Sequence, residues 1–307
     1  MISASHNAPD ASAHGSSPVE HADTVETRLF LDEHDRAFYD EWDKALHARK
    51  LEKPSRYTRH RQDPQGYRDA LGAFPWHLDE DMHSDMFIGD HAMWWLEERK
   101  SPDPLFLQIG FPGPHPPYDP VPRHLARYAT TDIPLPHVTE AEIARQPRSQ
   151  AELRQNMIHN NYDSVAWQAQ PSDEALLRMR RHYAANVSMI DHQVGEIMKT
   201  LDERGYLDNA LVIFTSDHGD ALGDHGHIQK WTMYDCSVRV PLVLWSRKLV
   251  GHKRNDPLVQ LMDIAPTVLE AAGLAAPKEF EARSLWPILN GERGEIRTEV
   301  YSELARD

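Results

Sequence analysis

The stretch ALVIFTSDHGDALGDHGHIQK, residues 210–230, decides the fold, because an apolar run changes abruptly into a polar, glycine-rich segment. Residues 210–215 form a short apolar run that is rich in strand-forming side chains, as is typical of a buried strand. Residues 216–230 combine Asp, His, Gly and Lys. In α/β proteins, ligands bind at the carboxyl ends of the strands. The sequence therefore predicts an α/β protein with a candidate site in residues 216–230.

The alternation of strands and helices extends outward on both sides. Apolar runs predict further strands at residues 105–111 and 240–245. Apolar periodicity and capping residues predict helices at 32–50, 84–100, 172–204 and 263–272. The buried stripe of the third helix is predicted to consist of apolar residues at steps of four and three: Tyr183, Val187, Ile190, Val194, Ile197 and Leu201. This alternation indicates a mostly parallel central sheet flanked by helices.

The remaining segments carry weaker structural signals. Residues 1–30 are predicted to be a poorly ordered or cut N-terminal segment, and the main domain to span residues 31–307. Residues 53–72 are basic and turn-prone. Residues 112–120 are predicted to form a rigid proline-rich loop after a strand. The polar, proline-punctuated residues 123–170 are predicted to be a surface insertion.

Composition and charge disfavour several classes of function. The chain has 307 residues and a formal net charge of −15, which disfavours binding to nucleic acid or to an anionic membrane. No apolar run approaches the roughly 18 residues that a membrane helix needs. The single cysteine forbids an intrachain disulfide. No basic start is followed by an apolar segment, so no secretory signal is recognised and a cytoplasmic protein is expected.

Asp217 and His218 are the candidate metal ligands. They stand at the end of the strand predicted at residues 210–215, where Gly219 leaves both side chains free to converge on one cation. A carboxylate oxygen with an imidazole nitrogen suits a divalent metal of intermediate hardness. Lys230 could supply a positive charge for an anionic group. An Asp–His pair in a loop is more often a turn with an Asx hydrogen bond, so both interpretations stay open on these residues alone.

Other polar residues of this loop have simpler interpretations. His225 and His227 are interpreted as residues with ordinary loop hydrogen bonds rather than as ligands. Asp220 and Asp224 are interpreted as solvated loop carboxylates. These interpretations leave the predicted chemistry with Asp217, His218 and Lys230.

A series of motifs follows in one order along the chain: residues 111–118 (FPGPHPPY), 186–204, 215–220, 222–226, Lys230, Tyr234 and 239–242. This series resembles the sulfatase family of the alkaline-phosphatase superfamily, over about residues 84–301. The resemblance implies an alkaline-phosphatase-like sandwich with a mostly parallel central sheet flanked by helices. It also implies hydrolysis of a sulfuric ester.

The resemblance assigns roles to single residues. Asp217 and His218 would be metal ligands, Lys230 would contact the sulfate and the nucleophile, and His115 the sulfate or the leaving oxygen. The implied cofactor is one divalent cation, Ca²⁺ first, with Mg²⁺ or Mn²⁺ as alternatives. Sulfate ester hydrolysis leaves negative charge on the sulfuryl and leaving oxygens, so a Lewis acid, an ammonium and a His acid are appropriate groups. The implied partner is a sulfated small molecule or carbohydrate.

Two parts of the family pattern have no counterpart in this sequence. Members use a formylglycine nucleophile made from a C/S-x-P-S-R motif, and they complete the metal site with two further Asp residues. Cys236 lacks Pro and Ser at the required offsets and is interpreted as a small buried filler beside a strand. The stretch Pro54-Ser55-Arg56 follows Glu52, which cannot become formylglycine. No adjacent Asp–Asp pair occurs.

Three interpretations therefore stay open. The chain is an incomplete sulfatase that lacks N-terminal strands and a C-terminal part, a noncatalytic protein that binds a cation or an anion, or a phosphonate monoester or phosphodiester hydrolase of the same superfamily. The position of Lys230 and the Arg-Val-Pro-Leu run at residues 239–242 favour sulfate. A sheet that lacks a core strand exposes an edge, so aggregation or completion by a homo-oligomer is expected.

Overall fold

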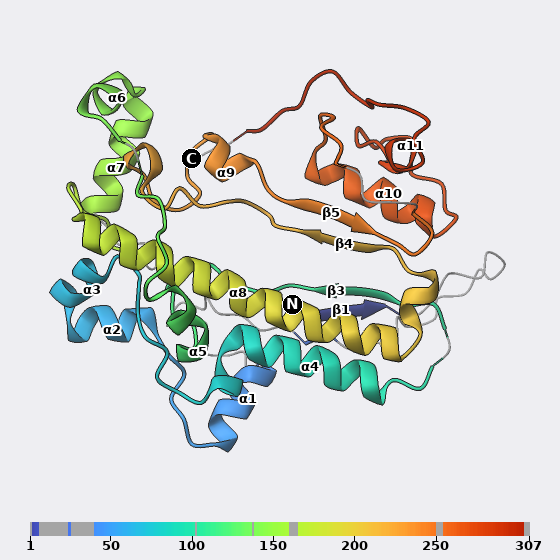
Figure 1. Cartoon of the computed structure of the whole chain (residues 1–307), viewed down its shortest axis with the longest axis horizontal. Helices are drawn as coiled ribbons and strands as arrows, with labels where there is room; N and C mark the ends of the chain where they lie inside the picture. The colour runs from blue at the N-terminus through green and yellow to red at the C-terminus, as the bar shows by residue number, and fades with distance from the viewer. Residues whose placement is uncertain are drawn as a thin grey trace. The chain divides into compact units, whose positions relative to one another are not determined.

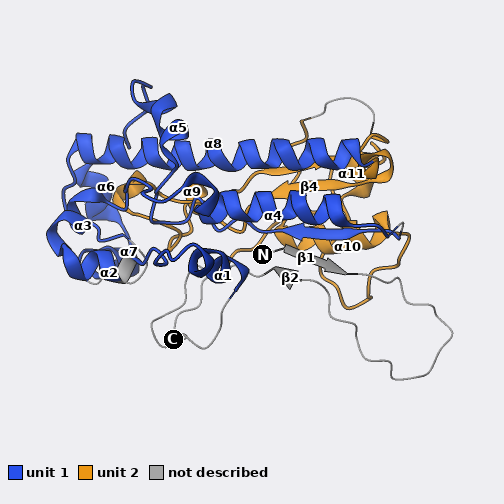
Figure 2. Cartoon of the chain, turned by 90° about the horizontal axis from the view of Figure 1, so that it is seen from below, with its two compact units in different colours: residues 1–204 blue, residues 205–307 orange. Residues whose placement is uncertain are grey.

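The structure, a computed structural model, describes residues 2–5, 24–25, 40–101, 103–136, 138–159, 165–249 and 254–303. The first two ranges, with Arg56 and Tyr57, are described by their backbone alone. The chain divides into two units, Met1–Arg204 and Gly205–Asp307 (Figure 2). Most elements of both units are helices, with a few short strands.

Helix α8 (Asp173–Glu203) is the longest element of the first unit and confirms the helix predicted at residues 172–204. It begins where the Ser172 hydroxyl accepts a hydrogen bond from the backbone N–H of Ala175, at 3.2 Å. Acidic side chains fill its first turn, where the helix dipole favours negative charge. Gly205 follows its end with a φ of 74°, a left-handed conformation that glycine adopts without strain.

The buried face of α8 differs from the predicted apolar stripe. Ile190 and Ile197 are buried as predicted, but Val187 is 45% exposed. The face carries polar side chains among its apolar ones: Ala175, Leu176, Met179, His182, Ala185, Asn186, Met189, Ile190, Gln193, Ile197 and Thr200. The stripe prediction was wrong about this face because it counted only apolar residues, whereas polar side chains are buried where the fold supplies hydrogen-bond partners.

Helix α4 (Ser84–Glu98) confirms the helix predicted at residues 84–100 and packs along α8 (Figure 1). Its inward side chains Ile88, Ala92 and Leu96 have no exposed surface. Gln193 of α8 donates a hydrogen bond to the Asp90 carboxylate at 3.2 Å. The two helices therefore form the centre of the first unit through apolar contact and a polar link.

Helix α1 (Glu41–Ala48) confirms part of the helix predicted at residues 32–50, of which residues 32–39 lie outside the described residues. Trp42 and Leu46 are each 1% exposed, as their four-residue spacing predicts. The Trp42 indole N–H donates to the carbonyl oxygen of Met82, in the short helix η1 (Glu80–Met82), at 2.9 Å. The helix is thus held by packing and by one buried hydrogen bond.

Residues 53–72 form two helices where the sequence indicated turns. Helix α2 (Arg56–Gln62) begins at Ser55, and helix α3 (Pro64–Ala70) begins at Asp63. The Asp63 carboxylate accepts from the N–H of Gly66 at 2.9 Å, and a proline occupies the first helical position of α3. The turn prediction was wrong because capping residues and an initial proline start helices as readily as they mark turns.

The described part of the predicted surface insertion, residues 123–170, is largely helical. Its elements are α5 (Pro122–Leu125), which begins one residue earlier, η2 (Ala126–Tyr128), α6 (Glu140–Arg145) and α7 (Arg148–His159). Its far end is anchored, since Trp167 is 2% exposed. The Arg68 guanidinium donates to the carbonyl oxygens of Ile158 and Trp167 at 2.8 and 3.0 Å. The end of this segment therefore belongs to the core of the first unit.

The strands predicted at residues 105–111, 210–215 and 240–245 are present as β3 (Phe106–Ile109), β4 (Val212–Thr215) and β5 (Leu242–Trp245). Every pairing among the described strands is antiparallel, so the predicted parallel pairing is wrong for them. Predicted burial is also wrong in part, because Phe106, Phe214 and Val243 are 48%, 45% and 55% exposed. An apolar run predicts an extended segment, but the chain connections decide the pairing direction.

Strand β3 pairs with β1 (Ile2–Ser5), which also pairs with β2 (Thr24–Val25). Both partners come from residues 1–30, the predicted poorly ordered segment, whose other residues lie outside the described ones. The described parts of that segment therefore contribute a sheet edge to the first unit.

In the second unit, β4 and β5 lie with η3 (Tyr206–Asn209), η4 (Asp224–Gly226), α9 (Asp235–Val238), η5 (Leu261–Asp263), α10 (Ile264–Ala271) and α11 (Trp286–Leu289). Helix α10 confirms the helix predicted at residues 263–272. Leu285, Ile288 and Ile296 form an apolar cluster against the inner side chains of β5. The polar centre of this unit is the fully buried Asp263.

Asp263 joins three segments of the second unit. One carboxylate oxygen accepts from the N–H of Gln260 and the other from the N–H of Arg283, both at 2.8 Å. The same carboxylate forms an ion pair with the guanidinium of Arg297, whose side chain is 9% exposed. A buried charge with this many partners is a strong local constraint.

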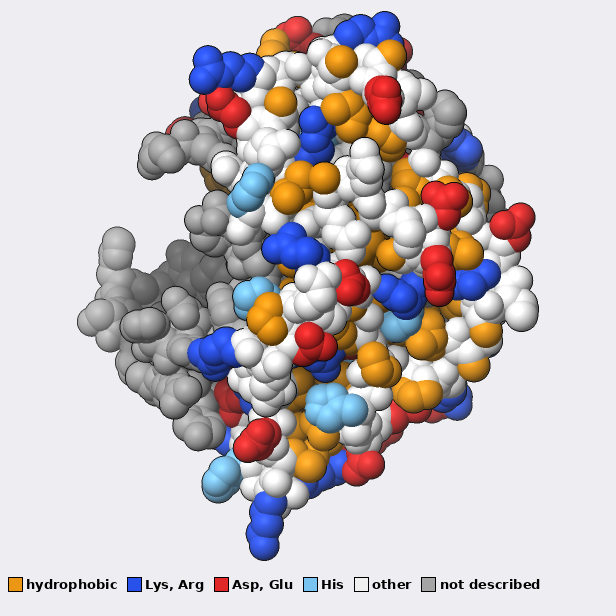
Figure 3. Space-filling view, turned by 90° about the vertical axis from the view of Figure 1, so that its left-hand side faces the viewer, with side chains coloured by type: hydrophobic (Ala, Val, Ile, Leu, Met, Phe, Trp, Pro, Cys, Tyr) orange, Lys and Arg blue, Asp and Glu red, His pale blue; other side chains and the backbone are white. Residues whose placement is uncertain are grey.

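Neither charge nor apolarity accumulates on the surface shown in Figure 3, where the described acidic, basic and apolar side chains are interspersed. In the described part of the chain, no helix combines the length and apolarity needed to cross a membrane.

Replacing Asp263 by Ala should lower the free energy of unfolding by about 3–5 kcal/mol, because it leaves the buried Arg297 charge unpaired. Asp256→Ala is the matched control, since its ion pair with Arg254 is over 80% exposed on both sides. Urea denaturation of both variants checks this. Equal losses would show that the buried ion pair is not a major constraint.

His124 should make stability depend on pH. Burial, with the nearby charge of Arg123, lowers the pKa of this 1%-exposed imidazole to about 4. The unfolded chain binds the proton near pH 6.5, so stability is lost as the pH falls from that value towards 4. Between pH 7 and pH 5 the loss should be about 2 kcal/mol. His124→Gln should remove that share of the pH dependence in denaturant titrations; an unchanged pH profile would contradict the assignment.

Candidate functional site

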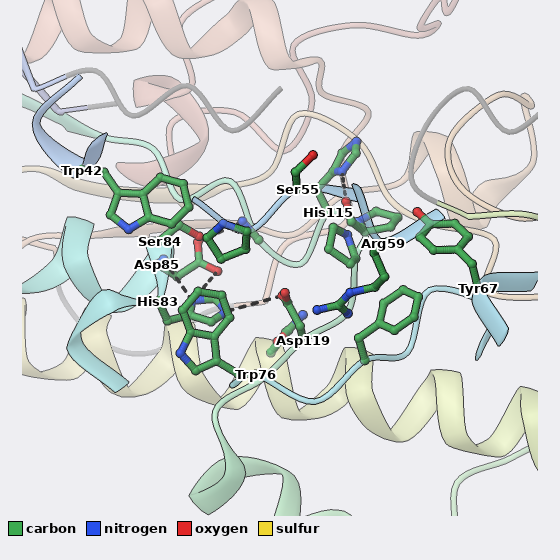
Figure 4. A pocket seen from close by; sticks show the side chains of 16 residues that line it. Trp42, Ser55, Arg59, Tyr67, Trp76, His83, Ser84, Asp85, His115 and Asp119 are labelled. Atoms are coloured by element: carbon green, nitrogen blue, oxygen red, sulfur yellow. Dashed lines mark hydrogen bonds and ion pairs between the residues drawn. The ribbon is translucent and has the colours of Figure 1, made fainter. Parts of the chain in front are cut away.

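A cavity of about 80 Å³ lies beside His115 in the first unit (Figure 4). It is enclosed by aromatic side chains, prolines and a group of titratable residues. The lining residues are Trp42, Pro54, Ser55, Arg59, Tyr67, Phe74, Trp76, His83, Ser84, Asp85, Gly113, His115, Pro116, Pro117, Asp119 and Asn186. Helices α1, α4 and α8 and the loop after β3 all contribute to it.

Three titratable residues form one wall of the cavity: His83 and Asp85 are buried, and Asp119 is partly buried. The His83 imidazole lies 3.5 Å from an Asp119 oxygen through Nε2 and 3.8 Å from an Asp85 oxygen through Nδ1. Nδ1 also accepts from the backbone N–H of Asp85 at 3.2 Å, so the neutral ring carries its proton on Nε2, facing Asp119. Burial raises the pKa of the Asp85 carboxyl. Burial also lowers the pKa of His83, but the hydrogen bond and charge of Asp119 outweigh that effect and raise it overall.

The proline-rich loop that carries His115 is held at both ends. At its start, the Asp85 carboxylate accepts from the N–H of Gly113 at 2.9 Å. A Cβ atom on Gly113 would lie 2.3 Å from that carboxylate, so only glycine allows this approach. At its end, the buried His182 of α8 donates from Nδ1 to the carbonyl oxygen of Tyr118 at 3.0 Å. The loop is therefore a fixed wall of the cavity.

His115, a predicted catalytic residue, lines the cavity. Its Nδ1 lies 2.8 Å from the carbonyl oxygen of Pro116. A carbonyl oxygen only accepts, so Nδ1 carries a proton in this arrangement. The local backbone thus fixes the tautomer of the neutral ring, in which Nε2 is the nitrogen that carries the lone pair. Its catalytic role stays a prediction.

The predicted metal ligands Asp217 and His218 come together in the second unit. The Asp217 side chain is 84% exposed, and one of its oxygens accepts from the backbone N–H of His218 at 2.9 Å. Nδ1 of His218 donates to the carbonyl oxygen of Gly219 at 2.8 Å. Nε2 of His218 lies 3.5 Å from the other Asp217 oxygen. The two side chains converge, but the Asp217 hydrogen bond goes to the next residue, whereas an Asx turn needs the residue two further on, whose N–H here donates to Ser237.

This pair has the donor chemistry of two metal ligands. With its proton on Nδ1, neutral His218 presents the Nε2 lone pair beside a carboxylate oxygen, and two such donors suit a divalent cation. Calcium takes six to eight oxygen ligands, whereas this pair supplies one carboxylate group and one imidazole nitrogen. Nowhere in the described residues do three or more His, Cys, Asp or Glu side chains gather as a metal site would require. The residues present therefore fit part of a ligand set.

The loop around the pair is held by its own side chains. One oxygen of Asp220 accepts from the N–H groups of Leu222 and Gln229, each at 2.9 Å, so the interpretation of Asp220 as a solvated carboxylate is wrong. His225 stacks on Tyr234 with ring centroids 3.8 Å apart, which supports a structural role. The Lys230 ammonium lies 5.4 Å from the centre of the Trp231 ring, within cation–π range.

Gly219 is required by close backbone packing. Its N–H donates to the carbonyl oxygen of Ser237 at 2.8 Å, and a Cβ atom would lie 2.0 Å from the carbonyl oxygen of Cys236. Cys236 is half-buried in α9 rather than fully buried beside a strand, which corrects the prediction for it. Burial raises the pKa of its thiol. The pairing of Gly219 with α9 anchors the segment that carries Asp217 and His218.

Residues 26–274 match the family model described as Sulfatase. The chain belongs to the sulfatase family. It is 29% identical over 233 residues to an arylsulfatase of Clostridium perfringens, covering 75% of this chain and 46% of that relative. It is 31% identical over 252 residues to PehA, a multifunctional alkaline phosphatase superfamily protein of Trinickia caryophylli. This match covers 78% of this chain and 48% of that relative. The chain thus spans about half the length of the curated relatives it matches.

Solved structures support the alkaline-phosphatase-like sulfatase fold. A phosphonate monoester hydrolase of Agrobacterium radiobacter has a TM-score of 0.65 at 26% identity, covering 85% of this chain and 52% of that one. A phosphonate monoester hydrolase of Silicibacter pomeroyi has the same TM-score at 20% identity, covering 85% and 51%. The predicted family is therefore confirmed.

The four predicted site residues of this sulfatase-family chain belong to different units. His115 is in the first unit, and Asp217, His218 and Lys230 are in the second. Sequence reasoning missed other cavity residues with polar side chains: Arg59, His83, Asp85, Asp119 and Asn186. Two sequence signals could have pointed to this cavity. His83 is at the N-cap of α4, and Asn186 is at a buried position of α8, on the face that repeats every three to four residues.

Gly219→Ala should lower the free energy of unfolding by about 1–3 kcal/mol, because the added Cβ displaces the Cys236 carbonyl. Gly195→Ala is the control: it lies inside α8 with open space around it and should raise that energy by about 0.5–1 kcal/mol. Thermal and urea unfolding measure both. A neutral Gly219→Ala would show that the loop does not need this backbone contact.

Proposed function

We propose that this chain carries the metal- and sulfate-binding part of a sulfuric ester hydrolase that cleaves a sulfate monoester. The observation that carries the proposal is the Asp217–His218 pair, in which a carboxylate oxygen and Nε2 lie 3.5 Å apart. Family membership supports assigning the pair to one divalent cation. Ca²⁺ is proposed first because of the resemblance to the family, with Mg²⁺ or Mn²⁺ as alternatives, since a carboxylate oxygen suits all three cations.

Each proposed residue has a distinct task at the sulfate group. A bound cation supplies a Lewis acid for the sulfuryl oxygens. Lys230 supplies a positive charge that is held near the Trp231 ring. His115, with Nδ1 fixed on the Pro116 carbonyl, uses Nε2 to donate a proton to the leaving oxygen when the ring is protonated. The nucleophile of the family pattern has no counterpart in these 307 residues.

The proposed substrate class is a sulfated carbohydrate or small molecule. One relative, 25% identical and covered over 49% of its length, is an N-acetylglucosamine-6-O-sulfatase of Bacteroides thetaiotaomicron. Another, 29% identical and covered over 40% of its length, is a choline-sulfatase of Rhizobium meliloti. The substrates that these two names state are both sulfate esters, but of different alcohols. The proposal for this chain therefore specifies the sulfate ester and leaves the alcohol open.

A phosphonate monoester hydrolase is the second candidate. It is favoured by the TM-score of 0.65 and 26% identity to the Agrobacterium radiobacter enzyme of that name. Sulfate and phosphonate monoesters both present tetrahedral anions with a leaving alkoxide. The same cation, ammonium and imidazole would therefore serve either ester.

Calorimetric titration of the full chain should show Ca²⁺ binding that Asp217→Asn weakens by roughly tenfold or more, because a charged ligand is lost. Asp235→Asn is the matched control: its carboxylate is in the same unit and is 79% exposed, against 84% for Asp217. The control should keep its affinity. Equal affinity in both variants would remove Asp217 from the metal site.

Hydrolysis of 4-nitrophenyl sulfate and of a 4-nitrophenyl phosphonate distinguishes the candidates. Faster release of 4-nitrophenol from the sulfate supports a sulfatase. Faster release from the phosphonate supports a phosphonate monoester hydrolase. Lys230→Ala should reduce either rate by about 100-fold, the usual effect of losing one charge-stabilising group. Retained Ca²⁺ affinity without turnover of either ester would support a noncatalytic cation-binding chain.

A further inference from the structure

Three side chains of the His115 cavity have buried polar atoms without a hydrogen-bond partner among the described residues. The Nε2 atom of His83 faces the Asp119 carboxylate at 3.5 Å, and the proposal concerns the other two. One is the Asn186 Oδ1 acceptor on α8, in a residue that is 2% exposed. The other is the Arg59 Nη1 donor on α2. Both residues line the same cavity. Buried polar groups normally have partners, so this pairing of an acceptor and a donor points to a ligand or water that supplies both functions.

The charges of the cavity disfavour an anion as that ligand. The basic lining residues Arg59 and His83 are matched in number by the acidic residues Asp85 and Asp119. The Asp119 carboxylate is only 13% exposed and faces the cavity. Figure 4 shows Arg59 extending from one side of the cavity towards Asp119. Sulfate only accepts hydrogen bonds, so it would satisfy Arg59 but not Asn186, and it would be repelled by Asp119. A hydroxyl group both donates and accepts.

The walls and size of the cavity limit the ligand further. The Arg59 guanidinium lies 4.2 Å from the centre of the Phe74 ring, which fixes the donor in place. Trp76 packs edge-on against His83, with ring centroids 4.6 Å apart, and fixes the opposite wall. A volume of about 80 Å³ holds roughly five water-sized groups at ~15 Å³ each. That is room for part of a sugar or a small polyol.

We propose that this cavity binds the neutral, hydroxyl-bearing alcohol part of the ester substrate, with Asn186 and Asp119 accepting from its hydroxyl groups and Arg59 donating to one. This proposal rests on the proposed function, because His115, the residue proposed to protonate the leaving oxygen, lines the same cavity. The alcohol part is thereby held beside the proposed acid. The cavity selects a hydroxylated alcohol over an apolar or charged one.

The test is a titration of the full chain, labelled with ¹⁵N at its Trp indoles, with D-glucose and separately with sodium sulfate. Trp42 and Trp76 line the cavity, and their indole N–H groups are held by the carbonyls of Met82 and Asp79, so their signals report on ligand entry. Trp→Phe variants assign them. Glucose should shift both signals to saturation, and sulfate should leave them unchanged. Shifts with sulfate alone, or none with glucose, overturn the proposal.

Two variants test the residues. Asn186→Leu and Arg59→Met should each weaken glucose binding by about fivefold or more, the usual effect of one hydrogen bond. The control is Asn255→Leu, an exposed Asn of the second unit, which should bind glucose like the parent chain. Unchanged affinity in a folded Asn186→Leu or Arg59→Met variant overturns the assignment. Arg59→Met keeps the proposal testable where Asn186→Leu fails to fold.

Glucose binding is measured without turnover and without a metal. The experiment can therefore refute the cavity proposal and the proposed hydrolysis independently of each other. Saturable glucose shifts in a chain without Ca²⁺ affinity would support the cavity as a polyol site and overturn its link to the ester. Ca²⁺ binding through Asp217 without glucose shifts would overturn the cavity proposal and leave the proposed function standing.

Discussion

The packing of α4 against α8 is the interaction on which the first unit depends. It places the start of α4, with His83 and Asp85, beside the middle of α8, and both helices then hold the proline-rich loop. Asp85 binds the N–H of Gly113 and His182 binds the carbonyl of Tyr118. The cavity beside His115 exists because these two helices fix the backbone on either side of it.

The second unit uses a different constraint for its own loop. Here the backbone of Gly219 packs directly on α9, and the Asp220 carboxylate closes the following turn by accepting two backbone hydrogen bonds. These contacts leave Asp217 exposed and His218 oriented by the Gly219 carbonyl. A metal-ligand pair needs this combination, since the ligands must be held in place while their lone pairs stay accessible.

Much of the local structure was predictable, because it depends on neighbouring residues. Ser172 and the acidic first turn start α8 as predicted, and Trp42 and Leu46 occupy the buried side of α1. The missed helices α2 and α3 were ambiguous, since Ser55 and the Asp63–Pro64 pair are compatible with both caps and turns. The polar face of α8 was missed because Asn186 and Gln193 have no apolar signal, although they occupy core positions of the repeat.

The sequence by itself determined the family, the helices and strands with strong periodicity, and the adjacency of Asp217 and His218, because each of these depends on residues close together or on motifs in a fixed order. Only the tertiary structure decided the antiparallel pairing of the described strands and the meeting of Arg59, Asp119 and Asn186 around one cavity. These residues are far apart in the chain. Their proximity follows from helix packing and from the course of the chain between elements, which local patterns do not encode.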